Sequence, residues 1–450
     1  MRGICVSGLT DKPAPSFLAS LSHSPGAGDL LHSHPVLSTR VRALFESTSL
    51  QRLRIVTDSK YVFTGALHVP VRGTQDIDPG AINASMSNLA QAISSLPSLA
   101  TEYIGNKRSI LDFVARAIVE QSGTGSREIL DLFSGTGVVS ASFKMLGYRV
   151  TANDHLATCF NLTSAILLND RAPYFKGLAA EVLEGIGKED AYQQVLDQLN
   201  SLVPRPGGFV HQSFSPASSD TIGVERRYFT EINAQKIDAI RDQIAKWRPL
   251  LADAEHALLV SDLVRAVSAV SNVAGTFGCY LKHWKQRALA PLILRPTGFI
   301  GGNKGDHAVT SLEARDMVKN STARIIYADP PYTKRQYAAY YHVLETIVQN
   351  DKPTLTGSTG LRDWETQSSD FCYKRKAPGA LKDLLSLMKC EHFFLSYNED
   401  GQMEHNQILD VMLPFGRVSF REMPLRRYKS SSLPHKGPTV AERIYHLEVR

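Results

Sequence analysis

The sequence lacks several patterns that would assign it at once to a class of protein. Its five cysteines include no Cys-x-x-Cys pair, so neither a disulfide framework nor a zinc site is expected, and a reducing compartment fits. No segment reaches the roughly 18 uninterrupted apolar residues of a membrane span, and the N-terminus does not resemble a signal peptide. Internal repeats are also missing. These absences predict a cytoplasmic protein that does not enter a membrane.

The composition has no extreme of charge or hydrophobicity either. Of the 450 residues, 43% are hydrophobic and 21% are charged, which is ordinary for a globular chain. The formal net charge of +6 is a mild basic excess that permits a polyanionic partner without requiring one. The length suits one large domain with insertions or two to three domains.

Residues 1–98 are the least patterned part of the chain. Serine, proline, glycine and histidine are frequent over 13–35, which is typical of loops. Residues 41–56 and 61–71 permit a short helix and strands, and a helix is plausible after Met86. We expect residues 1–98 to form an N-terminal arm, and Met86 is an alternative translation start.

Residues 99–170 show a regular α/β pattern. Apolar spacing predicts a helix over 109–120, a strand over 128–133, a helix over 138–146 and a strand over 148–152. Strand, turn, helix and strand in so short a space form a βαβ unit, which implies a parallel sheet.

The remaining chain interrupts that pattern and then resumes it. Residues 171–306 contain three helical patterns, over 190–202, 229–247 and 254–270, and are expected to form an inserted, mainly helical subdomain. Residues 307–450 return to an α/β pattern. Its expected strands are 307–312, 325–328, 392–398, 417–420 and 441–449, and its expected helices are 315–319, 340–349 and 380–389.

The first chemical motif is Asp131-Leu-Phe-Ser-Gly-Thr-Gly, at the turn from a strand to a helix. Gly135 and Gly137 stand where side chains would obstruct a nucleotide-like ligand, although a tight turn without a ligand would also suit them. Asp154 ends the next strand, 19 residues after Gly135, close to the spacing of an acid that binds ribose hydroxyls. A third glycine is missing, so the pattern favours a ligand with a ribose and no pyrophosphate.

The second motif is Asp329-Pro-Pro-Tyr, directly after the apolar run 325–328. Proline cannot continue a strand, so the chain must leave the sheet with an acid at the strand's carboxyl end. A carboxylate and the carbonyl of Pro330 can both accept hydrogen bonds from an exocyclic amine, which localises the lone pair of that nitrogen. Pro331 stiffens the turn, and Tyr332 offers a face for stacking a base. The same residues would also suit a strand that merely ends at a proline turn.

Taken in order, these pieces resemble the Dam-like (D12) DNA adenine-N6 methyltransferases, including the modification enzymes of type II restriction systems. The resemblance covers about residues 100–450. It rests on Tyr103-Ile-Gly-Asn-Lys-Arg-Ser-Ile-Leu, Asp131-Leu-Phe-Ser-Gly-Thr-Gly, Asn153-Asp154, Tyr228-Phe-Thr, Ala328-Asp-Pro-Pro-Tyr, Tyr340-Tyr-His-Val-Leu-Glu-Thr-Ile and Leu395-Ser-Tyr-Asn.

The resemblance implies a Rossmann-like, seven-stranded methyltransferase core that uses S-adenosyl-L-methionine and no metal. Asp154 would hold the ribose, and Glu313 occupies the place of the acid near the adenine ring, where aspartate is more usual. Asp329, Pro330, Pro331 and Tyr332 would be catalytic. The residues expected to contact the cofactor are Tyr103, Lys107, Asp131, Phe133, Ser134, Gly135, Gly137, Asp154 and Asp329.

The resemblance also implies double-stranded DNA as the partner, with an adenine flipped out of the stack. The inserted residues 171–306 would choose the target, between a cofactor half at 99–170 and a catalytic half at 307–450. Basic segments at 282–287, 373–376 and 426–429, with Lys334 and Arg335, are candidate phosphate contacts.

A cognate restriction endonuclease and a place in the prokaryotic cytoplasm, near the nucleoid, would follow from membership of a restriction-modification system. The sequence leaves the oligomeric state open. Two alternatives also stay open at this point: an RNA guanine-N2 methyltransferase, which faces the same chemical problem, and a DNA-binding homologue without activity.

Overall fold

The computed structural model describes residues 50–56, 62–68, 103–104, 106–123, 127–301, 306–426 and 439–450. The chain divides into two compact units, residues 1–73 and residues 74–450. In the first, β1 (Leu50–Val56) and β2 (Val62–His68) form an antiparallel hairpin in which Leu50 lies opposite His68. This confirms strands in that region, whereas the helix expected after Met86 lies outside the described residues.

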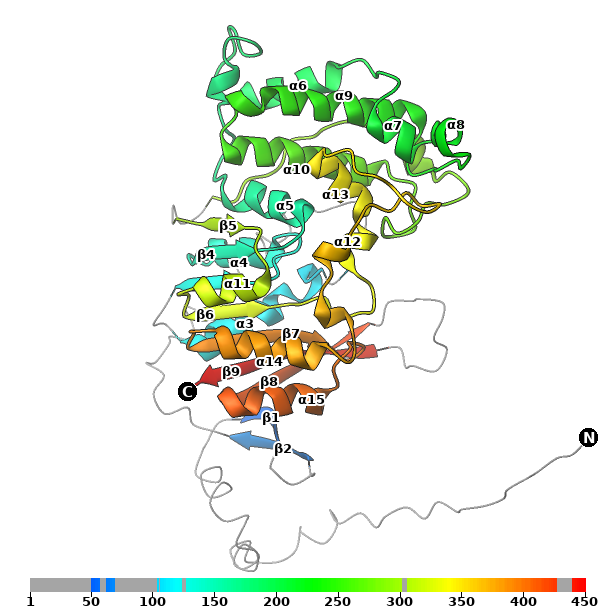
Figure 1. The fold of residues 1–450 in the computed structure, drawn as a ribbon. Coiled ribbons are helices and arrows are strands. Elements are labelled where there is room, and N and C mark those ends of the chain that lie inside the picture. The colour runs from blue at the N-terminus through cyan, green and yellow to red at the C-terminus, as the bar shows by residue number, and fades with distance from the viewer. Residues whose placement is uncertain are drawn as a thin grey trace, which may run out of the picture. The chain divides into compact units, whose positions relative to one another are not determined.

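The second unit is built on a seven-stranded sheet in the order β5-β4-β3-β6-β7-β9-β8 (Figure 1), which confirms the predicted fold class. Five neighbouring strands are parallel, and β9 pairs antiparallel with both β7 and β8. The strands are β3 (Glu128–Asp131), β4 (Arg149–Asn153), β5 (Ala308–Thr310), β6 (Ile325–Ala328), β7 (His392–Asn398), β8 (Gly416–Arg426) and β9 (Thr439–Val449).

Helices cover both faces of this sheet. One row is α3 (Leu111–Ser122), α4 (Val138–Met145) and α5 (Ala157–Leu167), and the other is α11 (Ala314–Asn320), α14 (Ala377–Leu387) and α15 (His405–Met412). Most of the apolar stripe of α3 predicted from the sequence, including Val114 and Ile118, is buried, and Val119 is partly buried. The described helices include none that is both long and apolar enough to cross a membrane.

The inserted residues form a helical group that shares its core with the rest of the unit. Its helices are α6 (Ala191–Ser201), α7 (Phe209–Phe214), α8 (Ser218–Ile222), α9 (Glu231–Trp247) and α10 (Asp253–Ala269), which gather beyond strand β5 in Figure 1. One hydrophobic cluster joins them to α5 and to α13 (His342–Gln349). The expected helix over 340–349 is interrupted, because α12 (Tyr337–Tyr340) ends before α13 begins.

The turn between β3 and α4 depends on Gly137. Its φ is +79°, and a Cβ placed there would lie 3.0 Å from Thr163 Oγ1 and 3.1 Å from Thr163 Cα. Gly137 therefore allows both the left-handed start of α4 and the close approach of α5.

We predict that Gly137→Ala lowers the free energy of unfolding by about 2–3 kcal/mol, because backbone strain and the Thr163 contact add up. Gly185→Ala is the matched control: its φ is +74° and nothing lies within 4 Å of the added Cβ. It should cost only about 1 kcal/mol. Denaturant unfolding of both variants measures the difference, and equal losses would contradict the role of Thr163.

Candidate active site

A cavity of about 880 Å³ opens at the carboxyl ends of β3, β4 and β6. Since β4 lies on one side of β3 and β6 on the other, the cavity is at the point where the strand order reverses, the usual ligand position in such sheets. Nine residues predicted from the sequence line it: Tyr103, Lys107, Asp131, Phe133, Ser134, Gly135, Asp154, Asp329 and Pro331. The structure thus brings together segments more than 200 residues apart.

The glycine-containing turn forms the floor of one end of the cavity. Gly135 has a φ of +53°, and a Cβ there would point at the ring of Tyr103, 3.4 Å away. Backbone bonds from Ser134 N to Asn153 O (2.9 Å) and from Gly137 N to Ser134 O (2.8 Å) fix the turn against the end of β4. Gly137 itself faces α5 and does not line the cavity, so its role is in the backbone.

Asp154 follows β4 and bridges two loops. Its Oδ2 accepts a hydrogen bond from Gly135 N (2.8 Å), and its Oδ1 accepts one from Leu156 N (3.0 Å). Burial raises the pKa of this carboxyl to about 6, although both backbone bonds oppose the shift. The Cys159 thiol also hydrogen-bonds to this carboxylate, which leaves room for one further donor, such as a ribose hydroxyl.

Asp131, at the end of β3, is almost fully buried. Ser140 donates to its Oδ2 at 2.6 Å, whereas its Oδ1 has no hydrogen-bond partner although it is buried at the cavity. Burial, with smaller contributions from the carboxylates of Asp329 and Asp154, raises the pKa of Asp131 to about 7, although the Ser140 hydrogen bond opposes the shift. An unsatisfied buried acceptor is costly, so this oxygen suits a donor or a cation on a ligand. The amino group of S-adenosylmethionine fits that description.

The rings of Tyr103 and Tyr337 line one side of the cavity, with the buried ring of Tyr341 behind them. Tyr103 stacks on Tyr341 with ring centroids 4.6 Å apart and meets Tyr337 edge-on at 5.8 Å. The Tyr103 hydroxyl lies 2.9 Å from Cys159 Sγ on α5, and Ile104 N donates to the Tyr341 hydroxyl at 2.8 Å. The segment before the sheet is thereby fixed to the helices after the catalytic loop.

Lys107 lies between two carboxylates at the other end of the cavity. Its Nζ is 2.9 Å from Asp329 Oδ1 and 3.2 Å from Glu442 Oε1, and the three side chains are only 5%, 13% and 2% exposed. Burial lowers the pKa of Lys107, but the two carboxylates outweigh it and raise the pKa well above its usual value. Lys107 is thus a permanent cation beside Asp329.

Glu442, on β9, is a site residue that the sequence analysis missed. Ser396 Oγ donates to its Oε1 (2.7 Å) and Asn398 Nδ2 to its Oε2 (2.9 Å), so β7 holds the glutamate that holds Lys107. Little in the sequence pointed to this role, because β9 also carries Arg443, His446 and Glu448. Burial raises the pKa of Asp329 to about 6, with Lys107 opposing and Glu442 adding to the shift.

The catalytic loop after β6 is held from several sides. The Gln336 side chain makes two hydrogen bonds to the backbone of Ser369, donating to its carbonyl (3.1 Å) and accepting from its N–H (2.8 Å). Pro330 is buried, and the Tyr332 ring lies 5.8 Å from Tyr397 with the Lys107 ammonium 5.3 Å from its centroid. Tyr332 and Pro330 are not among the residues that line the cavity, so their contacts with a base stay predictions.

Glu313 lines the cavity, as expected of a residue near a cofactor ring. Its carboxylate accepts a hydrogen bond from Arg315 N (3.3 Å) and so begins helix α11. Nothing in the structure tests the further expectation that it contacts the cofactor adenine.

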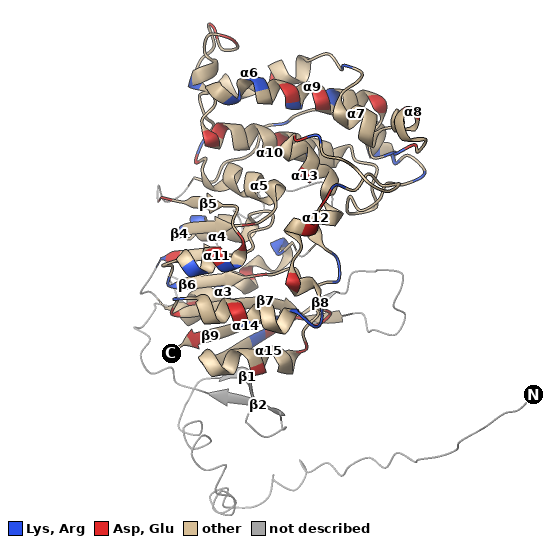
Figure 2. Cartoon of the chain, viewed as in Figure 1, with Lys and Arg blue, Asp and Glu red and all other residues tan. Residues whose placement is uncertain are grey.

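The basic segments proposed to contact DNA differ in how available they are. Lys285 and Arg287 both donate to the Val273 carbonyl, whereas Lys282 and His283 are exposed. Lys334 and Arg335 are exposed beside the catalytic loop, and the segment 426–429 lies outside the described side chains. In the view of Figure 2, lysines and arginines alternate with acids along α9 and α11, so charge alone does not define a DNA face there.

We predict that Lys107→Met lowers the free energy of unfolding by about 3 kcal/mol near neutral pH, since it leaves two buried carboxylates without their cation. Glu442→Gln in the same chain should recover part of the loss. Asp329 has a folded pKa of about 6 even with Lys107 beside it, and loss of the lysine raises that pKa further. The stability of the single variant should therefore improve as the pH falls towards 6. Thermal unfolding against pH checks both points, and a loss independent of pH would refute them.

Comparison with known proteins places this site in a family. A model of the D12 class N6 adenine-specific DNA methyltransferases matches residues 103–406. Modification methylase StsI of Streptococcus sanguinis is 33% identical over 352 residues, 77% of this chain and 51% of that protein. Type II methyltransferase M.FokI of Planomicrobium okeanokoites is 34% identical over 352 residues, covering 77% and 52%.

M.NlaIII of Neisseria lactamica, also a type II methyltransferase, is 31% identical over 353 residues, which cover 77% of this chain and 98% of that protein. The chain therefore spans about half the length of StsI and M.FokI and nearly all of M.NlaIII. By its matched residues and its cavity, this chain belongs to the D12 class of N6 adenine-specific DNA methyltransferases.

Proposed function

We propose that this protein methylates N6 of an adenine that has been flipped out of duplex DNA, using S-adenosyl-L-methionine. The observation that carries the proposal is the position of Asp329, which stands at the cavity beside the end of β3 and is held by a buried lysine. Membership of the D12 class favours adenine N6 over guanine N2 of RNA. The intact Asp329-Pro-Pro-Tyr loop argues against a homologue without activity.

The cofactor end of the cavity would be held by residues of the β3 and β4 loops. Asp154 would accept hydrogen bonds from the ribose hydroxyls, and the unpaired Oδ1 of Asp131 would face the methionine amino group. Phe133, Ser134 and Gly135 would line the path between them, with Tyr103 above the turn. When bound, S-adenosylmethionine supplies an electrophilic methyl group; the other steps belong to the protein.

Asp329 and the Pro330 carbonyl would accept the two N6 hydrogens of the flipped adenine. This draws the nitrogen towards tetrahedral geometry and localises its lone pair for attack on the methyl group. Lys107 occupies Asp329 Oδ1, which leaves Oδ2 for the amine. The nitrogen gives up its proton after it has become cationic, so no strong base is needed.

Residues 171–306 would choose the target sequence, with residues 99–170 as the cofactor half and 307–450 as the catalytic half. The exposed Lys334 and Arg335 beside the catalytic loop are suited to phosphates around the displaced nucleotide. Relatives named as type II and modification methylases support a place in a restriction-modification system, with an endonuclease that cuts the same site. Such a system would operate in the prokaryotic cytoplasm.

Expression in a host that lacks adenine methylation, followed by sequencing of its DNA for modified bases, tests the activity. We expect N6-methyladenine within one short motif. Asp329→Ala should reduce methylation by at least about 100-fold, because the acceptor for the amine is lost, while it still binds S-adenosylmethionine in equilibrium dialysis. Full methylation by Asp329→Ala would overturn the mechanism, and methylated guanine in RNA would favour the alternative substrate.

The rate should also depend on pH through Asp329. Its pKa of about 6 means that kcat, measured at saturating S-adenosylmethionine, should fall about tenfold per pH unit below that value. Glu442→Gln removes a carboxylate that raises this pKa, so the acid limb should move to lower pH. Glu422→Gln, on the exposed edge strand β8, should leave the limb in place. An acid limb unmoved in Glu442→Gln would disprove the assignment to Asp329.

A further inference from the structure

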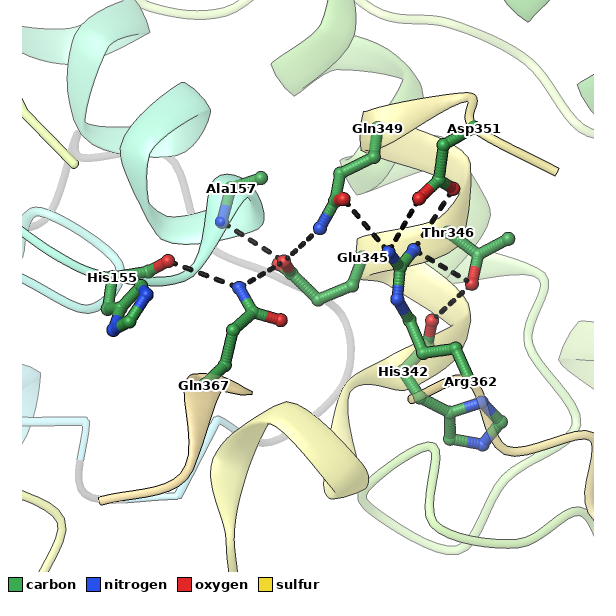
Figure 3. Close-up of polar contacts among 9 residues, drawn as sticks. All are labelled: His155, Ala157, His342, Glu345, Thr346, Gln349, Asp351, Arg362 and Gln367. Atoms are coloured by element: carbon green, nitrogen blue, oxygen red, sulfur yellow. Dashed lines mark hydrogen bonds and ion pairs between the residues drawn. The ribbon is translucent and has the colours of Figure 1, made fainter. Parts of the chain in front are cut away.

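A buried glutamate outside the methyl-transfer residues contacts the cofactor end of the site from a distant element. Glu345 lies on α13, is fully buried and accepts hydrogen bonds from Ala157 N (3.1 Å) and Thr158 N (2.7 Å). Figure 3 shows its carboxylate pointing away from α13 towards the start of α5. The two elements are more than 180 residues apart in sequence.

The two N–H groups belong to the first turn of α5, which has no side-chain cap of its own. The residue before the helix is Leu156, whose side chain cannot accept a hydrogen bond. The first N–H groups of a helix need acceptors and favour a carboxylate. Glu345 supplies that acceptor from another helix.

The same carboxylate is tied to the loop that enters α5. Gln367 Nε2 donates to the His155 carbonyl (3.2 Å) and lies 3.5 Å from Glu345 Oε2. His155 lies between Asp154 and Leu156, and the Leu156 N–H donates a hydrogen bond to the Asp154 carboxylate. Residues 155, 157 and 158 are thus held by Glu345 and Gln367, while residue 154 faces the cavity.

On its far side the glutamate is held in place by α13 and by the next loop. Gln349 Nε2 donates to Glu345 Oε2 at 3.0 Å, and Arg362 donates to Gln349 and to Asp351 (Figure 3). This end of the network does not contact α5 directly. It provides a place to perturb Glu345 without touching the cofactor loop.

We propose that Glu345 is a positioning residue that sets the place of Asp154 and thereby the affinity for S-adenosylmethionine. Helix α13 follows the Asp329 loop in the chain, and Tyr341, directly before the helix, is stacked on Tyr103. One helix would therefore align the loop that binds the cofactor with the half of the site that binds the target base. The inference rests on the proposed function, since it concerns the ribose end of that cofactor site.

A cap that is only structural would lower stability and leave the affinity of the folded protein unchanged. Positioning predicts a different result: a raised Kd and KM for S-adenosylmethionine, with kcat at saturation and KM for DNA close to those of the parent. Glu345 also raises the pKa of Asp154, which burial brings to about 6. Measurements at about pH 8 keep Asp154 ionised in every variant, so a change in affinity there reflects geometry.

The experiment compares Glu345→Gln, Glu345→Ala, Gln367→Ala and the control Gln193→Ala by calorimetric binding of S-adenosylmethionine and by steady-state kinetics on DNA. We expect a Kd about tenfold higher in Glu345→Ala and Gln367→Ala, because a small displacement of a binding group is costly. Glu345→Gln should be intermediate, since its single carboxamide oxygen can accept one of the two N–H groups. Gln193→Ala removes a comparable glutamine–acid bond, to Asp197 on the exposed side of α6, and should match the parent.

An unchanged Kd in Glu345→Gln and Gln367→Ala overturns the proposal. Glu345→Gln keeps the shape of the side chain and carries the test if Glu345→Ala does not fold, because Gln367 itself lines the cavity. A loss of DNA affinity with S-adenosylmethionine affinity intact also overturns it. If the parent protein itself binds no S-adenosylmethionine, the proposed function fails first and the inference falls with it. If the parent and the Glu345 and Gln367 variants all bind S-adenosylmethionine equally well, the inference is refuted and the proposed function is not.

Discussion

The active site depends on one buried ion pair, between Lys107 and Asp329. A carboxylate that must accept hydrogen bonds from an amine has to be ionised, yet burial opposes its charge. The lysine offsets that cost, and Glu442 fixes the lysine at a second point. Asp329, the proposed catalytic acid, is therefore held through the segment before the sheet, through β6 and, by way of Glu442 and its partners on β7, through β9. This explains why the active site needs the antiparallel end of the sheet as well as its parallel part.

The geometry of the parallel sheet brings the other residues of the candidate site to one edge. Asp131 pairs in register with Tyr327, so the acid that ends β3 and the acid that follows β6 emerge at the same edge. The cofactor loop after β4 reaches the same edge from the other side. Chain segments that are far apart in sequence meet there because strand ends meet, and Tyr103, which lines the cavity, is stacked on the buried Tyr341.

Much of the fold and of the candidate site could be predicted from the sequence. Strands that are buried on both faces are continuous apolar runs, and these runs end in recognisable turns. The strand over 392–398 has the predicted bounds, and nine of the twelve predicted site residues line the cavity. Helix α5 was not predicted, because it packs against α4, α10 and α13, is buried all round and so has no polar stripe. Glu442 and Glu345 were missed for a related reason: each acts through a partner that only the fold brings near.

The charges of the cavity agree with the ligand that the family uses. Asp131, Asp154 and Asp329 all have pKa values raised by burial, to about 7, 6 and 6. Lys107 compensates for Asp329, and the end of the cavity proposed for the cofactor keeps the carboxylates of Asp131 and Asp154. A ligand with a positive charge stabilises their ionised forms, whereas an anionic ligand such as a dinucleotide would be repelled. The missing third glycine and the clustered acids therefore point to the same chemistry, a ribose that carries a cationic group in place of a pyrophosphate.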